Sequence, residues 1–140
     1  MKILVAVDGS AFTKRMLAYL AEHQEWLGPT HGYTVLTVVP AVPSRAAAAL
    51  ARDVLKEHYA EEAEKVLQPV RSFFEQQQIS ADYVGKVGSA GDVIAEVAEQ
   101  GRFDLVMLGS HGHGTLGKLV LGSVSTKVMA HCSTPVLIIR

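Results

Sequence analysis

The sequence predicts an α/β domain of the doubly wound type, in which helices cover both faces of a parallel β-sheet. Five short β-rich runs alternate with four segments of helical periodicity along the 140 residues. Three of these runs are almost wholly apolar, which is typical of strands buried on both faces of a parallel sheet. We expect residues 1–140 to form a single domain, because a chain of this length buries about 70% of its unfolded surface around one core.

The expected strands are rich in β-branched and apolar residues and are separated by segments that contain turn-forming residues. They are predicted at residues 2–8, 33–39, 81–87, 103–109 and 135–140. The last strand begins at Pro135, where a missing backbone N–H is tolerated, and its apolar residues are followed by Arg140.

The first two helices are predicted from the spacing of their apolar residues. The first should begin near Ser10 and end in the glycine- and proline-rich segment 28–32. Its buried residues should be Leu17, Leu20 and Trp26. The second should run unbroken over residues 45–78, with an apolar stripe that begins at Leu50 and Val54.

The last two helices are shorter. One follows the turn at Gly88 and should end at Gly101, since glycine is common at helix C-termini. Its buried residues should be Val93, Ile94 and Val97. The other should span residues 117–131, before the final strand.

Composition excludes several classes of protein. The net charge of −1 creates no positive field, so neither nucleic acid nor an anionic membrane is expected as a partner. The single cysteine, Cys132, cannot form an internal disulfide. No apolar run approaches the about 20 residues that span a bilayer, and the N-terminal residues do not resemble a signal peptide. We therefore expect a cytoplasmic protein.

The segment "GSHGHGTLGKLVLGS", residues 109–123, contains three overlapping phosphate-binding signatures. The G-x-G-x-x-G spacing that starts at Gly112 is that of dinucleotide sites, but it follows the fourth strand, and no acid occurs after Asp104 to hold a ribose. The P-loop spacing that ends at Lys118 has Leu119 where a hydroxyl should coordinate magnesium. Neither of these two signatures is favoured.

The third signature joins residues 109–112 to residues 122–125 across an interval of nine residues. In this arrangement an anion would be bound both by the turn that leaves the strand and by backbone N–H groups and hydroxyls of "GSVS". The last 36 residues hold three basic residues and three histidines but no acid, which also favours an anion. A tight turn with a close helix–sheet contact would need the same glycines, and residue types alone leave both interpretations open.

Three further side chains are candidate ligands. Asp8 ends the first strand and is expected to contact a ligand, although it could instead cap the first helix. His111 and His113 have a spacing that suggests a metal-binding pair, but no cysteine or acid lies near them in sequence. We predict no metal-binding residue, and we expect His111 to contribute to the phosphate loop.

Three stretches of the chain resemble the universal stress protein family. They are "VAVDGS" near the N-terminus, "SAGDVIAEVAE" after Gly88, and residues 104–139, so the likeness covers essentially the whole chain. The third signature matches the ATP-binding motif of that family without a gap. The resemblance implies a Rossmann-like sheet of five parallel strands in the order 3-2-1-4-5, which would place Asp8 and Gly109 in one crevice at the switch point.

The resemblance also implies a set of binding residues. Ala6 and Asp8 would border the adenosine, and the backbone of Val38 would face the adenine edge. The glycine-rich loop would enclose the ribose and phosphates together with the start of the last helix. The complete implied set is Ala6, Asp8, Val38, Gly109, Ser110, His111, Gly112, His113, Gly114, Thr115, Gly122, Ser123, Val124 and Ser125.

By this resemblance the chain is expected to be a regulatory stress-response module that binds ATP or another adenine nucleotide, with Mg²⁺, and forms a homodimer through its last strand. No catalytic residue is predicted, and any hydrolysis should be far slower than the about 10 per second of typical enzymes. Two alternatives remain open. One is a slow ATPase or other nucleotide-dependent enzyme that uses the same pocket, and the other is an interaction protein whose pocket is vestigial.

Overall fold

The computed structural model describes residues 1–114 and 120–140 and confirms the doubly wound α/β fold. Five parallel strands form one sheet in the order β3-β2-β1-β4-β5. The strands are β1 (Lys2–Ala6), β2 (Gly32–Val39), β3 (Ala81–Val87), β4 (Leu105–Gly109) and β5 (Val136–Ile139). The order reverses between β1 and β4, so the carboxyl ends of these two strands flank the switch point.

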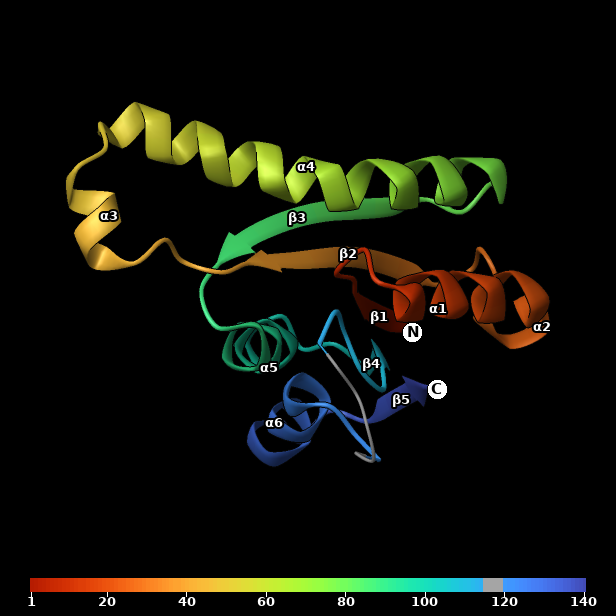
Figure 1. Cartoon of the computed structure of the whole chain (residues 1–140). Coiled ribbons are helices and arrows are strands. Elements are labelled where there is room, and N and C mark those ends of the chain that lie inside the picture. The colour runs from red at the N-terminus through yellow and green to blue at the C-terminus, as the bar shows by residue number, and fades with distance from the viewer. Residues whose placement is uncertain (115–119) are drawn as a thin grey trace.

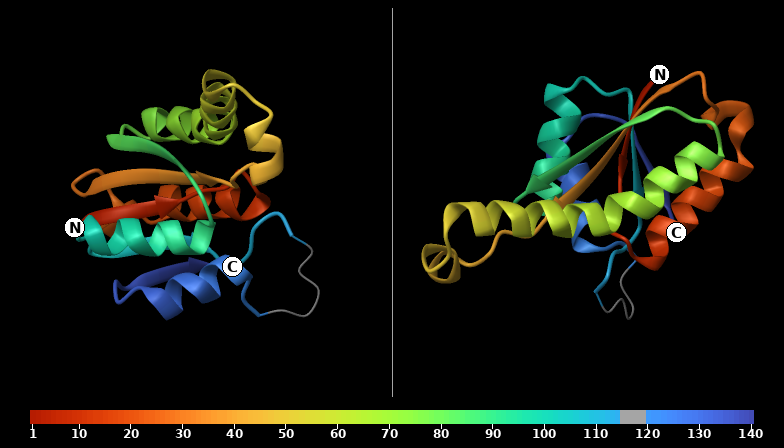
Figure 2. Two further views of the ribbon diagram at one scale, coloured as in Figure 1. Left: turned by 90° about the vertical axis from the view of Figure 1, so that its left-hand side faces the viewer. Right: turned by 90° about the horizontal axis from the view of Figure 1, so that it is seen from above.

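Helices cover both faces of this sheet, and α4 lies along β3 while α5 and α6 lie side by side on the opposite face (Figures 1 and 2). Two short helices, α2 and α3, belong to the connections on either side of β2. The helices are α1 (Ala11–Glu22), α2 (Gln24–Leu27), α3 (Ser44–Ala48), α4 (Arg52–Gln76), α5 (Ala90–Gln100) and α6 (Ser123–His131).

Successive residues of the central strand β1 point into two different cores. Ile3 is fully buried in the core formed with α1 and α4, where Phe74 is also fully buried. Leu4 is fully buried in the core formed with α5 and α6, where it shares a cluster with Val128. Burying one such aliphatic side chain contributes about 1.5–3 kcal/mol, so the sheet is held from both sides.

The prediction of one unbroken helix over residues 45–78 is wrong, because the chain leaves helical geometry at residues 49–51. Leu50 and Val54 are 43% and 51% exposed, so the predicted apolar stripe is not buried there. Figure 1 shows the reason: α3 and the start of α4 project beyond the carboxyl ends of β2 and β3. The Tyr59 hydroxyl accepts the backbone N–H of Val42 at 2.9 Å and fixes the linker to α4.

Two other helical predictions need correction. The first helix ends at Glu22, and the break at His23 changes the phase of the short helix that follows. As a result Leu27 is fully buried, whereas Trp26 is 39% exposed and does not point inward as predicted. The last helix begins at Ser123 instead of residue 117; residues 117–119 lie outside the described part of the chain.

Candidate functional site

A cavity of about 310 Å³ lies at the carboxyl ends of β1, β2 and β4. The first turns of α1, α5 and α6 and the glycine-rich loop after β4 complete its wall. Among the residues predicted from the sequence, those that line it are Ala6, Asp8, Val38, Gly109, His111, Gly112, His113, Gly114, Gly122, Ser123, Val124 and Ser125. Residues more than 100 positions apart in sequence therefore meet in one site.

Two predicted site residues do not line the described wall. Ser110 is only 2% exposed and lies behind it, and Thr115 lies outside the described residues. Sequence reasoning also missed a largely apolar part of the wall. It consists of Val7, Phe12, Thr13, Leu36, Ala90, Ile94 and Leu108. Their position at the ends of strands and the starts of helices indicated that they line the cavity, but apolar residues at such positions are also typical of the hydrophobic core.

The turn between β1 and α1 is fixed by a network around Asp8. Ser10 caps α1 by accepting the N–H of Phe12, so Asp8 is not the helix cap. Instead Asp8 Oδ1 accepts the Ser10 N–H at 2.9 Å and the Thr13 hydroxyl at 3.1 Å. The Thr13 oxygen in turn accepts the backbone N–H groups of Asp8 and Gly9. One carboxylate oxygen therefore shapes the turn, and the residue still lines the cavity.

The N-terminus of α6 faces the cavity without a capping side chain, because its N-cap is Gly122. The first N–H groups of a helix have no partner within the helix and carry its positive dipole end, which favours an anion. The Ser125 hydroxyl lies 3.0 Å and 3.1 Å from the carbonyls of Ser110 and Gly122, so its proton is used inside the protein. Ser123 makes no side-chain hydrogen bond to any residue that the structure describes, which leaves its hydroxyl available to a ligand.

Gly122 allows α6 to start close against the end of β4. A Cβ at this position would lie 3.2 Å from both His111 Cα and the Ser110 carbonyl oxygen. The Gly122 N–H donates to that carbonyl at 2.7 Å, while the Ser110 N–H donates to Ile139 of β5. The backbone of Ser110 thus joins β5, the loop and α6.

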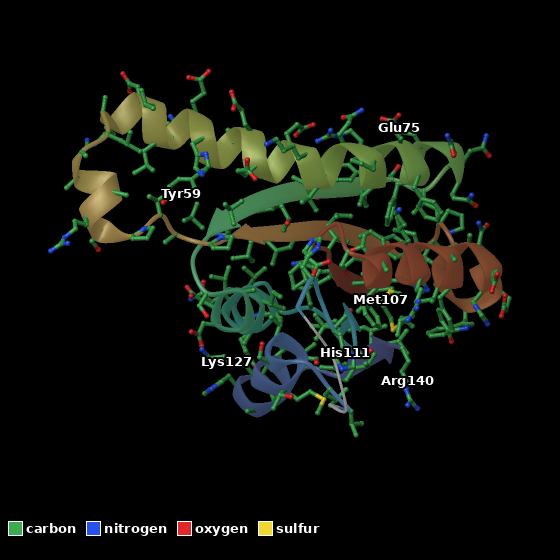
Figure 3. The ribbon with its side chains drawn as sticks, in the orientation of Figure 1. Tyr59, Glu75, Met107, His111, Lys127 and Arg140 are labelled. Carbon is green, nitrogen blue, oxygen red and sulfur yellow. The ribbon has the colours of Figure 1, made fainter. Side chains whose placement is uncertain are left out.

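His111 is held in the wall by its neighbours. Its Nδ1 lies 2.9 Å from the Ser110 hydroxyl, and its ring centroid is 5.3 Å from that of Phe12. Figure 3 shows His111 on the loop that follows β4, near α6. This places an imidazole beside the helix N-terminus just described.

Acidic side chains of α5 contact the C-terminal region, which contains no acid of its own. Lys127 Nζ lies 2.9 Å from Asp92 Oδ2 on α5, and this hydrogen-bonded ammonium lowers the pKa of the Asp92 carboxyl. Glu99 accepts the N–H and hydroxyl of Ser133, and these hydrogen bonds lower its pKa. The Lys127 charge is therefore paired with Asp92, and no lysine or arginine is found among the described residues that line the cavity.

No group of three His, Cys, Asp or Glu side chains that could hold a metal ion occurs within residues 1–114 and 120–140. Among the helices of this described part, none is both long and apolar enough to cross a membrane.

The universal stress protein family model matches residues 1–140. The chain belongs to the universal stress protein family. Among curated relatives, it is 31% identical over 150 residues to the universal stress protein Sll1388 of Synechocystis sp., a match that covers 99% of this chain and 97% of that protein.

Solved structures of universal stress proteins share the fold. The chain superposes on the protein MJ0577 of Methanocaldococcus jannaschii with a TM-score of 0.82 and 24% identity, covering 99% of this chain and 94% of that one. An Archaeoglobus fulgidus universal stress protein, solved in complex with dAMP, gives a TM-score of 0.70 at 21% identity, with coverage of 100% and 98%. An Arabidopsis thaliana family protein, solved with AMP bound, gives 0.69 at 18% identity, with coverage of 99% and 90%.

Proposed function

We propose that this universal stress protein is a regulatory module that binds ATP or a related adenine nucleotide in the cavity at the switch point. The observation that carries the proposal is the uncapped N-terminus of α6, which faces a cavity whose wall also has a largely apolar part. A nucleotide needs both environments, because its phosphates are anionic and its base is flat and largely apolar. The dAMP and AMP complexes of similarly folded proteins support an adenine nucleotide as the ligand.

The polarity of the cavity gives the nucleotide its orientation. The base would lie against Leu36, Val38 and Ile94, where the wall is apolar. The phosphates would accept backbone N–H groups at the start of α6 and the Ser123 hydroxyl. Asp8, between these two ends, would face the sugar.

Mg²⁺ is proposed to enter with the nucleotide. Asp8 is the single carboxylate among the described residues that line the cavity, and one of its oxygens is already used by Ser10 and Thr13. One free carboxylate oxygen is too small a donor set for Mg²⁺, which prefers six oxygen ligands. The ion would therefore depend on the phosphates of the nucleotide and on water for most of its ligands.

The proposal is tested by identifying and titrating the ligand. Mass spectrometry of the purified protein, before and after acid release, should detect an adenine nucleotide, and calorimetry of the nucleotide-free chain should give saturable binding of ATP with Mg²⁺. Phosphate release in the same samples should stay far below about 10 per second. Absence of saturable binding of ATP, ADP and AMP would overturn the proposal, and fast release of phosphate would favour the enzyme alternative.

We also propose that the chain forms a homodimer through β5. At the other sheet edge, β3 exposes the charged residues Asp82 and Lys86, which oppose edge pairing, whereas β5 carries no charge over Val136–Ile139. The carbonyl of Pro135 accepts the N–H of Val106 in β4, and the carbonyl of Ile139 accepts the N–H of Ser110 directly after β4. Because backbone groups alternate in direction along a strand, the N–H of Ile138 points away from β4 and is free to pair with a second copy.

A further inference from the structure

His113 connects the glycine-rich loop to the turn after β1. Its Nε2 lies 2.6 Å from the backbone carbonyl oxygen of Asp8, across a separation of 105 residues in sequence. A carbonyl only accepts hydrogen bonds, so Nε2 carries a hydrogen and donates it. Both residues line the cavity, and the bond therefore joins two walls of the site.

A second contact lies next to this hydrogen bond. A Cβ built on Gly112 would be 2.5 Å from Asp8 Oδ2, closer than any side chain could approach. The loop backbone therefore lies directly against the Asp8 carboxylate. The hydrogen bond and the close approach fix two successive loop residues to the same partner.

Asp8 is a suitable anchor because its own position is fixed. Its side chain and backbone N–H both interact with Thr13 of α1, and its Oδ1 also accepts the Ser10 N–H. The residue follows β1, which is paired on both sides in the middle of the sheet. A loop attached to Asp8 is thus attached to a rigid part of the fold.

We propose that His113 is a positioning residue that holds residues 111–114 of the glycine-rich loop in their nucleotide-binding place before the ligand arrives. The proposal rests on the proposed function, and it assigns His113 no contact with the nucleotide. A loop that is already ordered loses less conformational freedom on binding, so the ligand binds more tightly and leaves more slowly. The imidazole acts through the Asp8 carbonyl.

The test compares His113→Ala, which removes the donor, with His113→Gln, whose amide nitrogen can replace Nε2. One exposed hydrogen bond corresponds to an effect of about three- to tenfold. We expect His113→Ala to weaken ATP binding by about this factor, through faster dissociation measured by stopped flow, and His113→Gln to bind within about twofold of the wild type. In the ligand-free protein, hydrogen exchange in residues 110–114 should accelerate in His113→Ala alone.

Gln24→Ala is the matched control. It removes another exposed hydrogen bond between distant segments, from Gln24 Nε2 to Gln77 Oε1 at 2.7 Å, and neither residue lines the cavity. It should leave ATP binding and loop exchange unchanged. Equal dissociation rates in the wild type and His113→Ala, tighter binding by His113→Ala, or failure of His113→Gln to restore binding would each overturn the role of His113. A wild-type chain that binds no nucleotide would overturn the proposed function as well, which is a distinct result.

Discussion

Replacing Gly122 with valine should abolish tight nucleotide binding while the chain stays folded. The Cβ of the new residue would lie 3.2 Å from two backbone atoms, His111 Cα and the Ser110 oxygen, neither of which can rotate away. The two methyl groups of valine add further crowding. The start of α6 must therefore move away from the end of β4, and its free N–H groups must move with it.

The expected loss follows from the hydrogen bonds at stake. The N–H groups of Ser123 and Val124 are proposed to bind phosphate oxygens, and a hydrogen bond to a charged group contributes about 1.5–3 kcal/mol. Losing both would weaken binding by about 3–6 kcal/mol, or roughly 10²- to 10⁴-fold. Crowding of this kind costs about 1–3 kcal/mol of stability, which is less than the about 5–15 kcal/mol that holds a typical domain together.

Isothermal titration with ATP and Mg²⁺ measures the effect, and circular dichroism with thermal unfolding verifies the fold. Gly32→Ala is the control glycine variant, because a Cβ there meets no atom within 4 Å and the residue lies outside the cavity wall. It should bind like the wild type. If Gly122→Val remains folded and binds ATP within about threefold of the wild type, the start of α6 does not bind the phosphates.

Two further predictions concern assembly and alkaline stability. Ile138→Pro should give a folded monomer, since the lost N–H points away from β4, whereas Leu137→Pro should damage the fold. Light scattering measures the oligomeric state of both variants, and circular dichroism measures their folding. A wild type that is monomeric at micromolar concentration, or two variants that both remain dimeric, would contradict this prediction. Burial raises the pKa of Tyr33 to about 12, and its hydroxyl donates to the Leu27 carbonyl at 2.6 Å. The folded pKa exceeds the unfolded value of about 10. The contribution of the un-ionised Tyr33 hydroxyl to the free energy of unfolding is therefore complete below pH about 10 and is lost as the pH rises to about 12. Tyr33→Phe should therefore lower the free energy of unfolding by about 1 kcal/mol at pH 7. Urea titrations should show this gap to the wild type closing as the pH rises above about 10, and a constant gap would contradict the reasoning.

The strands and the glycine-rich loop could be predicted because their signals are local. An apolar run of β1 alternates between two cores, and a loop after β4 must lie at the carboxyl edge of the sheet. The break at residues 49–51 could not be predicted, because it depends on where the sheet ends beneath the helix. Gly101 illustrates the same limit. It ends α5 as predicted, yet its φ is −79°, and a Cβ there would meet the Phe103 ring at 2.5 Å, so packing requires this glycine.

The glycine spacing that predicted a phosphate loop also produces close contacts within the protein. Gly112 lets the loop lie against Asp8, and Gly122 lets α6 start against Ser110, so the two glycines fix the two ends of the intervening segment to β1 and β4. Close packing and anion binding by these glycines are therefore compatible interpretations. Close packing brings the uncapped start of α6 to the cavity, and the proposed nucleotide would bind to the N–H groups placed there.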